Sequence, residues 1–388
     1  MPQQHMIALV FDYNLSYPRG VLRGVRQYAA NRPDWTLVLH GSDGFTPRSM
    51  ASLQGVGLIS DITSVELAKT LQTLPQPVVN VTSVVPNLNF PCVSVDHNQV
   101  GRLAFQHLWD RGFRQFAFVG HPHHPYSYER ENGFREALTE VGLTPECYYD
   151  RSRYAYRHRG RMLTVNSELQ QWLRNLKKPV GVFACHDVWA VHVIGACRLT
   201  ELRVPEDVAV IGVDNDDLLC ELALPSLSSI HVPVEQIGYQ AAALLDRLLK
   251  GEKRPEQPHL IPPVGVVARQ STDILAGADP DVTEALLFIR RNAHRPISVG
   301  ELLRQVPVSR RSLEMRFRSL LERGIGEEIR RVHLERAKEL LATSVLSVEE
   351  VAERSGFASA PYFARFFRQA TRMTPSDYRR QFHGSLQH

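Results

Sequence analysis

The sequence predicts an α/β body followed by an all-α segment that contains two helix-turn-helix units. Between residues 6 and 270, short apolar runs rich in β-branched residues alternate with amphipathic helical stretches. This alternation is typical of parallel sheets that are covered by helices on both faces. Near the C-terminus a helix-turn-helix pattern occurs twice, and no strand pattern accompanies it. The chain is therefore expected to change structural class shortly after residue 270.

Charge is spread unevenly over the 388 residues. Residues 276 to 388 hold 19 Lys and Arg against 14 Asp and Glu, whereas the remainder holds 26 against 27. All but one of those 19 cations are arginines, whose planar guanidinium suits phosphates and guanine edges. A basic segment joined to a nearly neutral body favours a polyanionic partner for the first and a small ligand for the second.

The α/β body is expected over residues 1–272, a linker over residues 273–283 and the all-α domain over residues 284–388. Gly277 and Pro280 interrupt the pattern close to the point where the charge balance shifts. The expected strands are residues 7–11, 37–40, 57–60, 78–81, 116–120, 181–184 and 208–213. The expected helices of the body include residues 19–30, 100–111, 129–141, 168–176, 188–200 and 234–250.

The all-α segment repeats one pattern at a separation of 50 residues. In each copy a serine precedes a helix with apolar inward positions, and an arginine follows the last of these. Because serine is a favourable N-cap, a helix is predicted to begin directly after it. The matched residues are Ser309, Leu313, Phe317 and Arg318 in the first copy and Ser359, Phe363, Phe367 and Arg368 in the second. The second helix of such a unit can enter the major groove of DNA.

The outward positions of these two helices are the candidate DNA contacts. They are Arg310, Arg311, Glu314, Met315 and Arg318 in the first copy, and Ala360, Pro361, Ala364, Arg365 and Arg368 in the second. Arg311 and Arg365 are expected to contact base edges, since a bidentate arginine on guanine gives about 1–3 kcal/mol of discrimination. Phosphate contacts are expected from Arg310, Arg316, Arg318 and Arg368. The alternative for any single arginine is a solvated helix surface.

Several motifs of this segment resemble the signature of AraC-type transcription regulators. They are Leu334-Glu335-Arg336-Ala337 with Leu340-Leu341, Val351-Ala352, Gly356-Phe357, Tyr362-Phe363-x-Arg365-x-Phe367-Arg368 and Thr374-Pro375-x-x-Tyr378-Arg379. The resemblance implies a regulator that binds double-stranded operator DNA. Pro307, Glu322 and Arg372 stand where this family has glycines, and proline cannot adopt a positive φ, so the first turn is expected to take another shape. Small Ala360 and Ala364 leave the second unit few groups for reading bases.

The α/β body resembles the effector domain of LacI-type repressors and of type I sugar-binding periplasmic proteins. The resemblance rests on Val93-Ser94-Val95-Asp96-His97-Asn98 with Gly101, on residues 112–120, 204–214 and 225–230, and on Arg269-Gln270-Ser271-Thr272. It implies two α/β lobes with a ligand cleft between them, at the carboxyl ends of the strands. The fold class expected for the whole chain is a two-lobed, periplasmic-binding-protein-like sensor followed by an AraC-type domain.

Polar residues near the ends of the expected strands are the candidate effector ligands, because a sugar needs hydrogen-bond donors and acceptors and an aromatic face. They are Asn14, Tyr17, Asp61, Arg130, His186, Asp187, Asp214 and Asn215. The resemblance places Asn14, Arg130, His186 and Asp214 on ligand-contacting positions, although His186 stands where asparagine is common and Thr82 replaces a customary acid. Each has a structural alternative: Asp214 can cap a turn, Arg130 can pair with a carboxylate and Tyr17 can simply pack.

Other classes of site have little support in the sequence. The run His121-Pro122-His123-His124 offers imidazoles to a metal, but it contains no Cys or carboxylate, and neither a metal nor a cofactor is expected. The common catalytic motifs are absent, which opposes an enzyme. The five cysteines are scattered and are expected to be reduced thiols. No signal-peptide pattern and no membrane-spanning apolar run is present, which favours the cytoplasm.

The sequence therefore predicts a sugar-responsive transcription regulator whose partners are operator DNA and a small sugar. A pentose, with D-xylose as the first candidate, is the expected effector, and the expected assembly is a homodimer that activates RNA polymerase. Sugar binding would favour a closed state of the lobes and reorient the DNA domains. The alternatives are a regulator of the same architecture for another monosaccharide or sugar derivative, a sugar-binding protein without operator recognition, and an enzyme with a regulatory tail.

Overall fold

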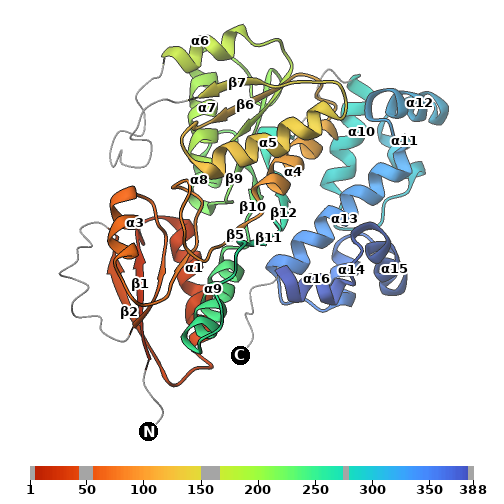
Figure 1. Cartoon of the computed structure of the whole chain (residues 1–388). Helices are drawn as coiled ribbons and strands as arrows, with labels where there is room; N and C mark the ends of the chain where they lie inside the picture. Colours follow the sequence, from red (N-terminus) through yellow and green to blue (C-terminus); the bar gives the residue numbers. More distant parts are fainter. Residues whose placement is uncertain (1–4, 43–55, 150–166, 274–278, 383–388) are drawn as a thin grey trace. The chain divides into compact units, whose positions relative to one another are not determined.

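A computed structural model describes residues 5–42, 56–149, 167–273 and 279–382 (Figure 1). The described residues belong to two compact units. Unit 1 draws on residues 1–99, 121–130 and 232–263, and unit 2 on residues 100–120, 131–231 and 264–388. Parallel α/β sheets precede a segment made of helices, so the expected fold class is confirmed.

Unit 1 is built on a four-stranded parallel sheet in the order β2-β1-β3-β4. Its strands are β1 (His5–Phe11), β2 (Trp35–Gly41), β3 (Val56–Ser60) and β4 (Val78–Asn80), and its helices include α1 (Ser16–Ala29), α3 (Val65–Gln72) and α9 (Val234–Leu249). A short parallel pair, β5 (Val93–Val95) and β11 (His259–Ile261), adds to it. A Cβ on Gly24 of α1 would lie 1.8 Å from the Glu235 carbonyl oxygen of α9, so the close packing of these helices requires glycine there.

Unit 2 contains a six-stranded sheet in the order β12-β10-β9-β8-β6-β7, in which β12 runs antiparallel to its neighbour. The strands are β6 (Phe116–Gly120), β7 (Glu146–Tyr149), β8 (Val180–Ala184), β9 (Val208–Val213), β10 (Ser228–His231) and β12 (Gly265–Val267). Its helices include α6 (Ser167–Asn175), α7 (Asp187–Leu199) and α8 (Asp217–Leu222). Two further helices, α4 (His97–Trp109) and α5 (Pro125–Thr139), begin within the residues of unit 1 and continue into unit 2.

The described residues from 279 to 382 form only helices and also belong to unit 2. These are α10 (Pro280–Arg291), α11 (Val299–Gln305), α12 (Arg310–Leu321), α13 (Ile325–Thr343), α14 (Val348–Arg354), α15 (Ala360–Thr371) and α16 (Pro375–Phe382). They bury two apolar cores. Leu313 and Phe317 of α12 pack with Ile289 in the first core, and Phe363 and Phe367 of α15 pack with Tyr378 in the second.

The two helix-turn-helix units differ at their turns and agree at their ends. In the first, Val306 ends α11 in an extended conformation (φ −104°) before Pro307, whereas the second turn uses Gly356 at φ 76°. The expectation that Pro307 changes the first turn is confirmed. Both recognition helices end on a left-handed residue that is not glycine, Glu322 at φ 60° and Arg372 at φ 62°. An L-residue in this conformation costs roughly 1–2 kcal/mol, so both helix ends hold a less stable geometry than glycine would give.

Candidate DNA-binding and effector-binding sites

Helix α12 presents a basic surface because its buried apolar side chains, Leu313, Phe317 and Leu321, lie on the opposite face. The Ser309 hydroxyl accepts a hydrogen bond from the Ser312 amide at 3.2 Å and so caps the helix, as predicted. Leu313 and Phe317 are fully buried, while Arg311 is exposed and Met315 is 65% exposed. Arg310 and Arg318 are exposed as well. Four of the five residues predicted for DNA contact thus share the outer face of α12.

Glu314, the fifth, also has a structural role. Its carboxylate accepts a hydrogen bond from the Ile325 amide at 3.3 Å, at the N-terminus of α13. A carboxylate stabilises that end of a helix because the first amides have no partner within the helix. The DNA contact from Glu314 stays a prediction.

Arg316 also takes part in the structure of the domain. Its guanidinium lies 2.7 Å from Asp279 and 2.6 Å from Asp281, which stand at the start of α10. These hydrogen bonds, foremost the one to Asp279, raise the pKa of Arg316. Because two carboxylates hold this cation, Arg316 joins α10 to α12, and its phosphate contact stays a prediction.

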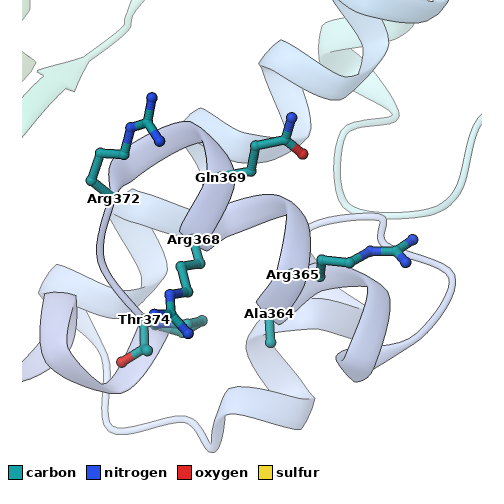
Figure 2. A pocket seen from close by; sticks show the side chains of 7 residues that line it. Ala364, Arg365, Arg368, Gln369, Arg372 and Thr374 are labelled. Carbon is teal, nitrogen blue, oxygen red and sulfur yellow. The ribbon is translucent and has the colours of Figure 1, made fainter.

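Helix α15 carries a groove lined by cationic side chains, shown in Figure 2. Ser359 caps the helix by accepting a hydrogen bond from the Tyr362 amide at 3.4 Å. Arg365 is exposed, and its guanidinium carbon lies 5.9 Å from the centre of the Tyr362 ring, within the range of a cation–π contact. The residues lining the groove are Ala364, Arg365, Arg368, Gln369, Arg372, Thr374 and Pro375. Ala360 and Pro361, predicted as contacts, stand in the first turn of α15 but do not line it.

Arg372 and Gln369 were not among the predicted contacts. The outward face predicted for α15 ended at Arg368, whereas the groove continues through Gln369 to the C-cap residue Arg372. A sequence signal existed for Arg372, because an arginine in place of a customary glycine adds a charge at the helix end.

In unit 1, three predicted effector residues lie near the carboxyl ends of strands. The Asn14 side-chain amide donates to Asp12 at 2.8 Å and Asn14 is exposed. The Tyr17 hydroxyl donates to the Val81 carbonyl at 2.7 Å. Asp61 is 2% exposed and accepts from the Asp12 amide at 3.3 Å. Asn14 is thus accessible to a ligand, whereas Asp61 is buried.

Arg130 and His97 form a buried pair in unit 1. The Arg130 Nε donates to His97 Nδ1 at 3.2 Å, and the guanidinium lies 5.3 Å from the Tyr126 ring centre. Because arginine can only donate, His97 Nδ1 must be the acceptor and Nε2 must carry the proton. Burial, and then the Arg130 charge, holds the pKa of His97 well below its usual range, so the ring stays neutral. His97 Nε2 has no hydrogen-bond partner among the described residues. His97 was not among the predicted site residues, because its motif indicated only a family resemblance.

In unit 2, Asp214 and Asn215 form the turn that follows β9. Both adopt positive φ, 104° and 52°, a conformation that Asp and Asn tolerate better than most residues. The Asp214 amide donates to the Ile230 carbonyl at 3.0 Å, and the Asn215 amide donates to the Ser229 hydroxyl at 3.0 Å. One backbone carbonyl and one hydroxyl of β10 therefore fix this turn, and both side chains are half-buried.

The two residues after β8 have different environments. His186 caps α7, because its Nδ1 accepts from the Trp189 amide at 3.4 Å. Asp187 is 1% exposed, and its carboxylate accepts from the Ser229 hydroxyl at 2.6 Å and the Asp216 amide at 2.9 Å. Burial first, and then the Asp214 charge, raises the pKa of Asp187. Asp187 therefore orders the turn that carries Asp214, and its own contact with the effector stays a prediction.

The histidines that follow β6 contact one another and a backbone carbonyl. The His121 and His124 rings stack at 4.2 Å, and His124 Nδ1 lies 3.1 Å from the Val84 carbonyl oxygen. Within the described ranges, no three His, Cys, Asp or Glu side chains are grouped as metal ligands. All five cysteines are free thiols. The helices that the structure describes include none long and apolar enough to cross a membrane.

Comparison with known proteins identifies the parts of the chain separately. Residues 6–95 match the XylR N-terminal domain, residues 105–272 a periplasmic binding protein-like domain and residues 302–381 a helix-turn-helix domain. The order of a sensor followed by a DNA-binding domain, predicted from the sequence, is thereby confirmed.

Whole-chain relatives share this order. The xylose operon regulatory protein of Haemophilus influenzae is 33% identical over 385 residues, covering 97% of this chain and 98% of that protein. The protein of the same name from Escherichia coli K12 is 32% identical over 389 residues, covering 97% of each. The solved structure of the xylose-binding transcription activator xylR matches with a TM-score of 0.61 and 31% identity, covering 98% of this chain and 99% of that one. The chain therefore belongs to the family of xylose operon regulatory proteins.

Proposed function

We infer that this chain binds D-xylose through its α/β part and that the sugar sets the affinity of its helix-turn-helix units for operator DNA. The observation that carries the proposal is the similarity to two xylose operon regulatory proteins over 97% of the chain, because it includes sensor and DNA-binding parts together. A ligand that binds one conformation better than another shifts the protein toward that conformation. If DNA also prefers that conformation, the sugar raises the DNA affinity, and DNA raises the sugar affinity by the same factor.

Asp214, Arg130 and Asn14 are the proposed hydrogen-bonding partners of the sugar hydroxyls. Asp214 stands on a turn fixed by β10, and Arg130 is held in place by His97. These contacts matter because a side chain contributes most to the affinity when it is already held in the orientation that binds the ligand. Tyr17, Asp61, His186 and Asn215 remain proposed contacts that each already make a structural hydrogen bond.

Arg311 and Arg365 are the proposed base-reading residues, and Arg310, Arg318 and Arg368 the proposed phosphate contacts. All five are exposed on α12 and α15. Met315, Ala360, Pro361 and Ala364 complete the proposed surface. The protein is further proposed to act in the cytoplasm as a homodimer, to activate transcription through RNA polymerase, and to bind its sugar without converting it.

The proposal is tested by titrating DNA from upstream of the chain's own gene with the full-length protein. D-xylose at saturation is expected to raise the DNA affinity at least about fivefold, the lower end of typical coupling between sites. L-arabinose and D-ribose, pentoses of other configuration, serve as matched controls. A response to another sugar alone would favour the sensor of a different monosaccharide, and DNA binding unaffected by every sugar would contradict sugar control.

Arg311→Ala is expected to weaken binding to the operator by about tenfold or more while binding to random DNA falls far less. The reason is that a bidentate arginine on guanine discriminates by about 1–3 kcal/mol, whereas a phosphate contact carries no sequence information. Fluorescence anisotropy with both DNAs measures the ratio. Arg304→Ala, which removes an exposed arginine from the preceding helix α11, is the control for lost charge. Equal weakening on both DNAs would assign Arg311 to phosphate.

A further inference from the structure

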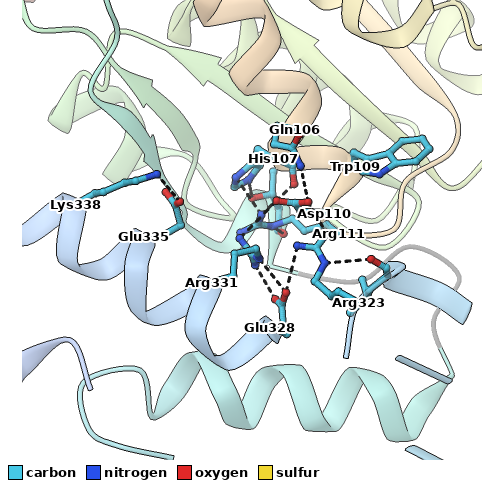
Figure 3. Close-up of polar contacts among 12 residues, drawn as sticks. Gln106, His107, Trp109, Asp110, Arg111, Arg323, Glu328, Arg331, Glu335 and Lys338 are labelled. Carbon is cyan, nitrogen blue, oxygen red and sulfur yellow. Dashed lines mark hydrogen bonds and ion pairs between the residues drawn. The ribbon is translucent and has the colours of Figure 1, made fainter. Parts of the chain in front are cut away.

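The end of helix α4 and the residue that follows it touch the DNA-binding helices directly, as Figure 3 shows. Asp110 follows α4, which belongs to the α/β part, and it is 7% exposed. Its carboxylate accepts hydrogen bonds from Arg323 at 2.5 Å and from Gln106 at 2.7 Å. Arg331 of α13 lies 3.7 Å from its second oxygen. Two cations from the DNA-binding part therefore meet one buried acid of the α/β part.

Glu328 completes this cluster from within α13. Arg331 donates to it through Nε at 2.9 Å and Nη2 at 2.7 Å, and Arg323 lies 3.5 Å away. Glu328 is fully buried, and the side chains of Arg323 and Arg331 are only 18% and 20% exposed. Burial disfavours the Arg331 charge, but Glu328 and Asp110 outweigh it and raise its pKa. Two carboxylates and the guanidinium groups of Arg323 and Arg331 thus alternate in a place largely closed to water, and the buried Arg111 interacts electrostatically with both carboxylates.

A further contact holds the same two parts together at another place. The Tyr378 hydroxyl of α16 donates to the Val264 carbonyl at 2.6 Å, and Val264 itself packs in the second apolar core of the DNA-binding helices. Within the α/β part, next to the cluster, Arg111 donates to the Thr272 carbonyl at 2.9 Å and so fixes the last residue before the predicted linker. The DNA-binding helices are therefore joined to the α/β part of unit 2 through the Asp110 cluster and through Tyr378, and not through the linker alone.

Charge balance makes Asp110 the sensitive member of the cluster. Without its carboxylate, the guanidinium groups of Arg323, Arg331 and Arg111 would have only the Glu328 carboxylate among them. A buried charge that loses its partner is strongly unfavourable, because it lost its water when the contact formed. The contact between α4 and α13 is then expected to open, which returns Arg323 to solvent and leaves the linker as the main connection on this side.

We propose that Asp110 is a positioning residue that makes the DNA-binding helices and the α/β part of unit 2 one rigid body, and that it thereby carries the effect of the sugar to the DNA contacts. The inference rests on the proposed function. A change in the α/β part alters the placement of α12 and α15 only if a stiff contact joins them, since a flexible linker transmits no orientation. Asp110 itself touches neither of the proposed ligand surfaces.

The test compares the full-length protein with Asp110→Asn, which keeps the shape and removes the charge. DNA affinity is measured with and without saturating D-xylose, and hydrogen exchange of the α13 amides is measured without sugar or DNA. Asp110→Asn is expected to lower the sugar-dependent change in DNA affinity at least about fivefold and to speed exchange in α13. Arg102→Gln is the matched control, because Arg102 lies on α4, the helix that precedes Asp110, and forms ion pairs with Glu136 of α5 and with Glu140, but its side chain is 44% exposed. It should leave both readings unchanged.

Arg323→Gln and the double variant separate coupling from instability. If Asp110 and Arg323 act through one contact, the double variant loses no more of the sugar response than Asp110→Asn alone. Should Asp110→Asn fail to fold, Arg323→Gln is expected to show the same loss of response. A full sugar response in folded Asp110→Asn would overturn the proposal. If the unaltered protein gives no sugar response, the proposed function fails, and unchanged α13 exchange in Asp110→Asn would then overturn the positioning role separately.

Discussion

Phe317→Ala is expected to destabilise the first helix-turn-helix unit by about 3–5 kcal/mol and to abolish specific DNA binding. Phe317 is fully buried and packs with Leu313 and Leu321 of its own helix and with residues of α10 and α11. Truncation removes the ring from the centre of this core and leaves a cavity that three short helices cannot close. Hydrogen exchange of the amides in α10, α11 and α12 measures this loss of local stability.

Met315→Ala is the matched control for this substitution. Met315 lies two residues away on the same helix but is 65% exposed, so its removal should leave exchange in α12 unchanged. Specific DNA binding should survive in this variant with moderate weakening at most. If Phe317→Ala exchanged as slowly as the unaltered protein, the first core would not be what holds α12 in place.

Asp214→Asn is expected to reduce the affinity for D-xylose by about 10-fold to 100-fold, since hydrogen bonds to charged groups contribute about 1.5–3 kcal/mol. Asparagine is chosen because it tolerates the positive φ of this position, so the turn after β9 should persist. Isothermal titration calorimetry with the full-length protein gives the dissociation constant. DNA affinity measured without sugar should stay as it is.

Asp217→Asn controls for the loss of a negative charge near this turn. Asp217 is exposed at the start of α8, three residues from Asp214, and should leave sugar binding intact. If Asp214→Asn and Asp217→Asn bound D-xylose equally well, Asp214 would be a turn residue alone. If both variants lost affinity equally, the effect would come from long-range electrostatics.

Most of the fold could be predicted because its signals are local. All seven expected strands are present, and their ends agree with those observed to within two residues. The serine caps located α12 and α15 to the residue, since an N-cap hydroxyl determines where a helix begins. The strands β5, β7, β10, β11 and β12 were not predicted. Each has only three or four residues, too few for a clear periodic pattern, and each exists through pairing with a distant segment.

The candidate sites were harder to predict, because the direction of a polar side chain depends on packing between distant segments. Helix geometry places Glu314 on the outer face of α12, but the start of α13 returns to that face and takes up its carboxylate. His186 and Asp187 are neighbours in the sequence, yet only Asp187 turns inward, toward Ser229. The contact between Asp110 and Arg323 joins residues 213 positions apart, and no local pattern indicates it.

The left-handed residues at the ends of α12 and α15, Glu322 and Arg372, lower the stability of the helix ends but contribute charged groups to contacts. Glycine at position 372 would relieve the backbone at the end of the recognition helix, but it would also take away a guanidinium from the edge of the cationic groove. At position 322 the substitution by glycine would remove a carboxylate that lies 3.7 Å from Arg114 of the α/β part. A glycine introduced at either helix end to raise the thermal stability of the regulator would therefore also change a contact. At position 372 it would weaken the cationic groove, and at position 322 it would weaken the contact between the helices and the α/β part.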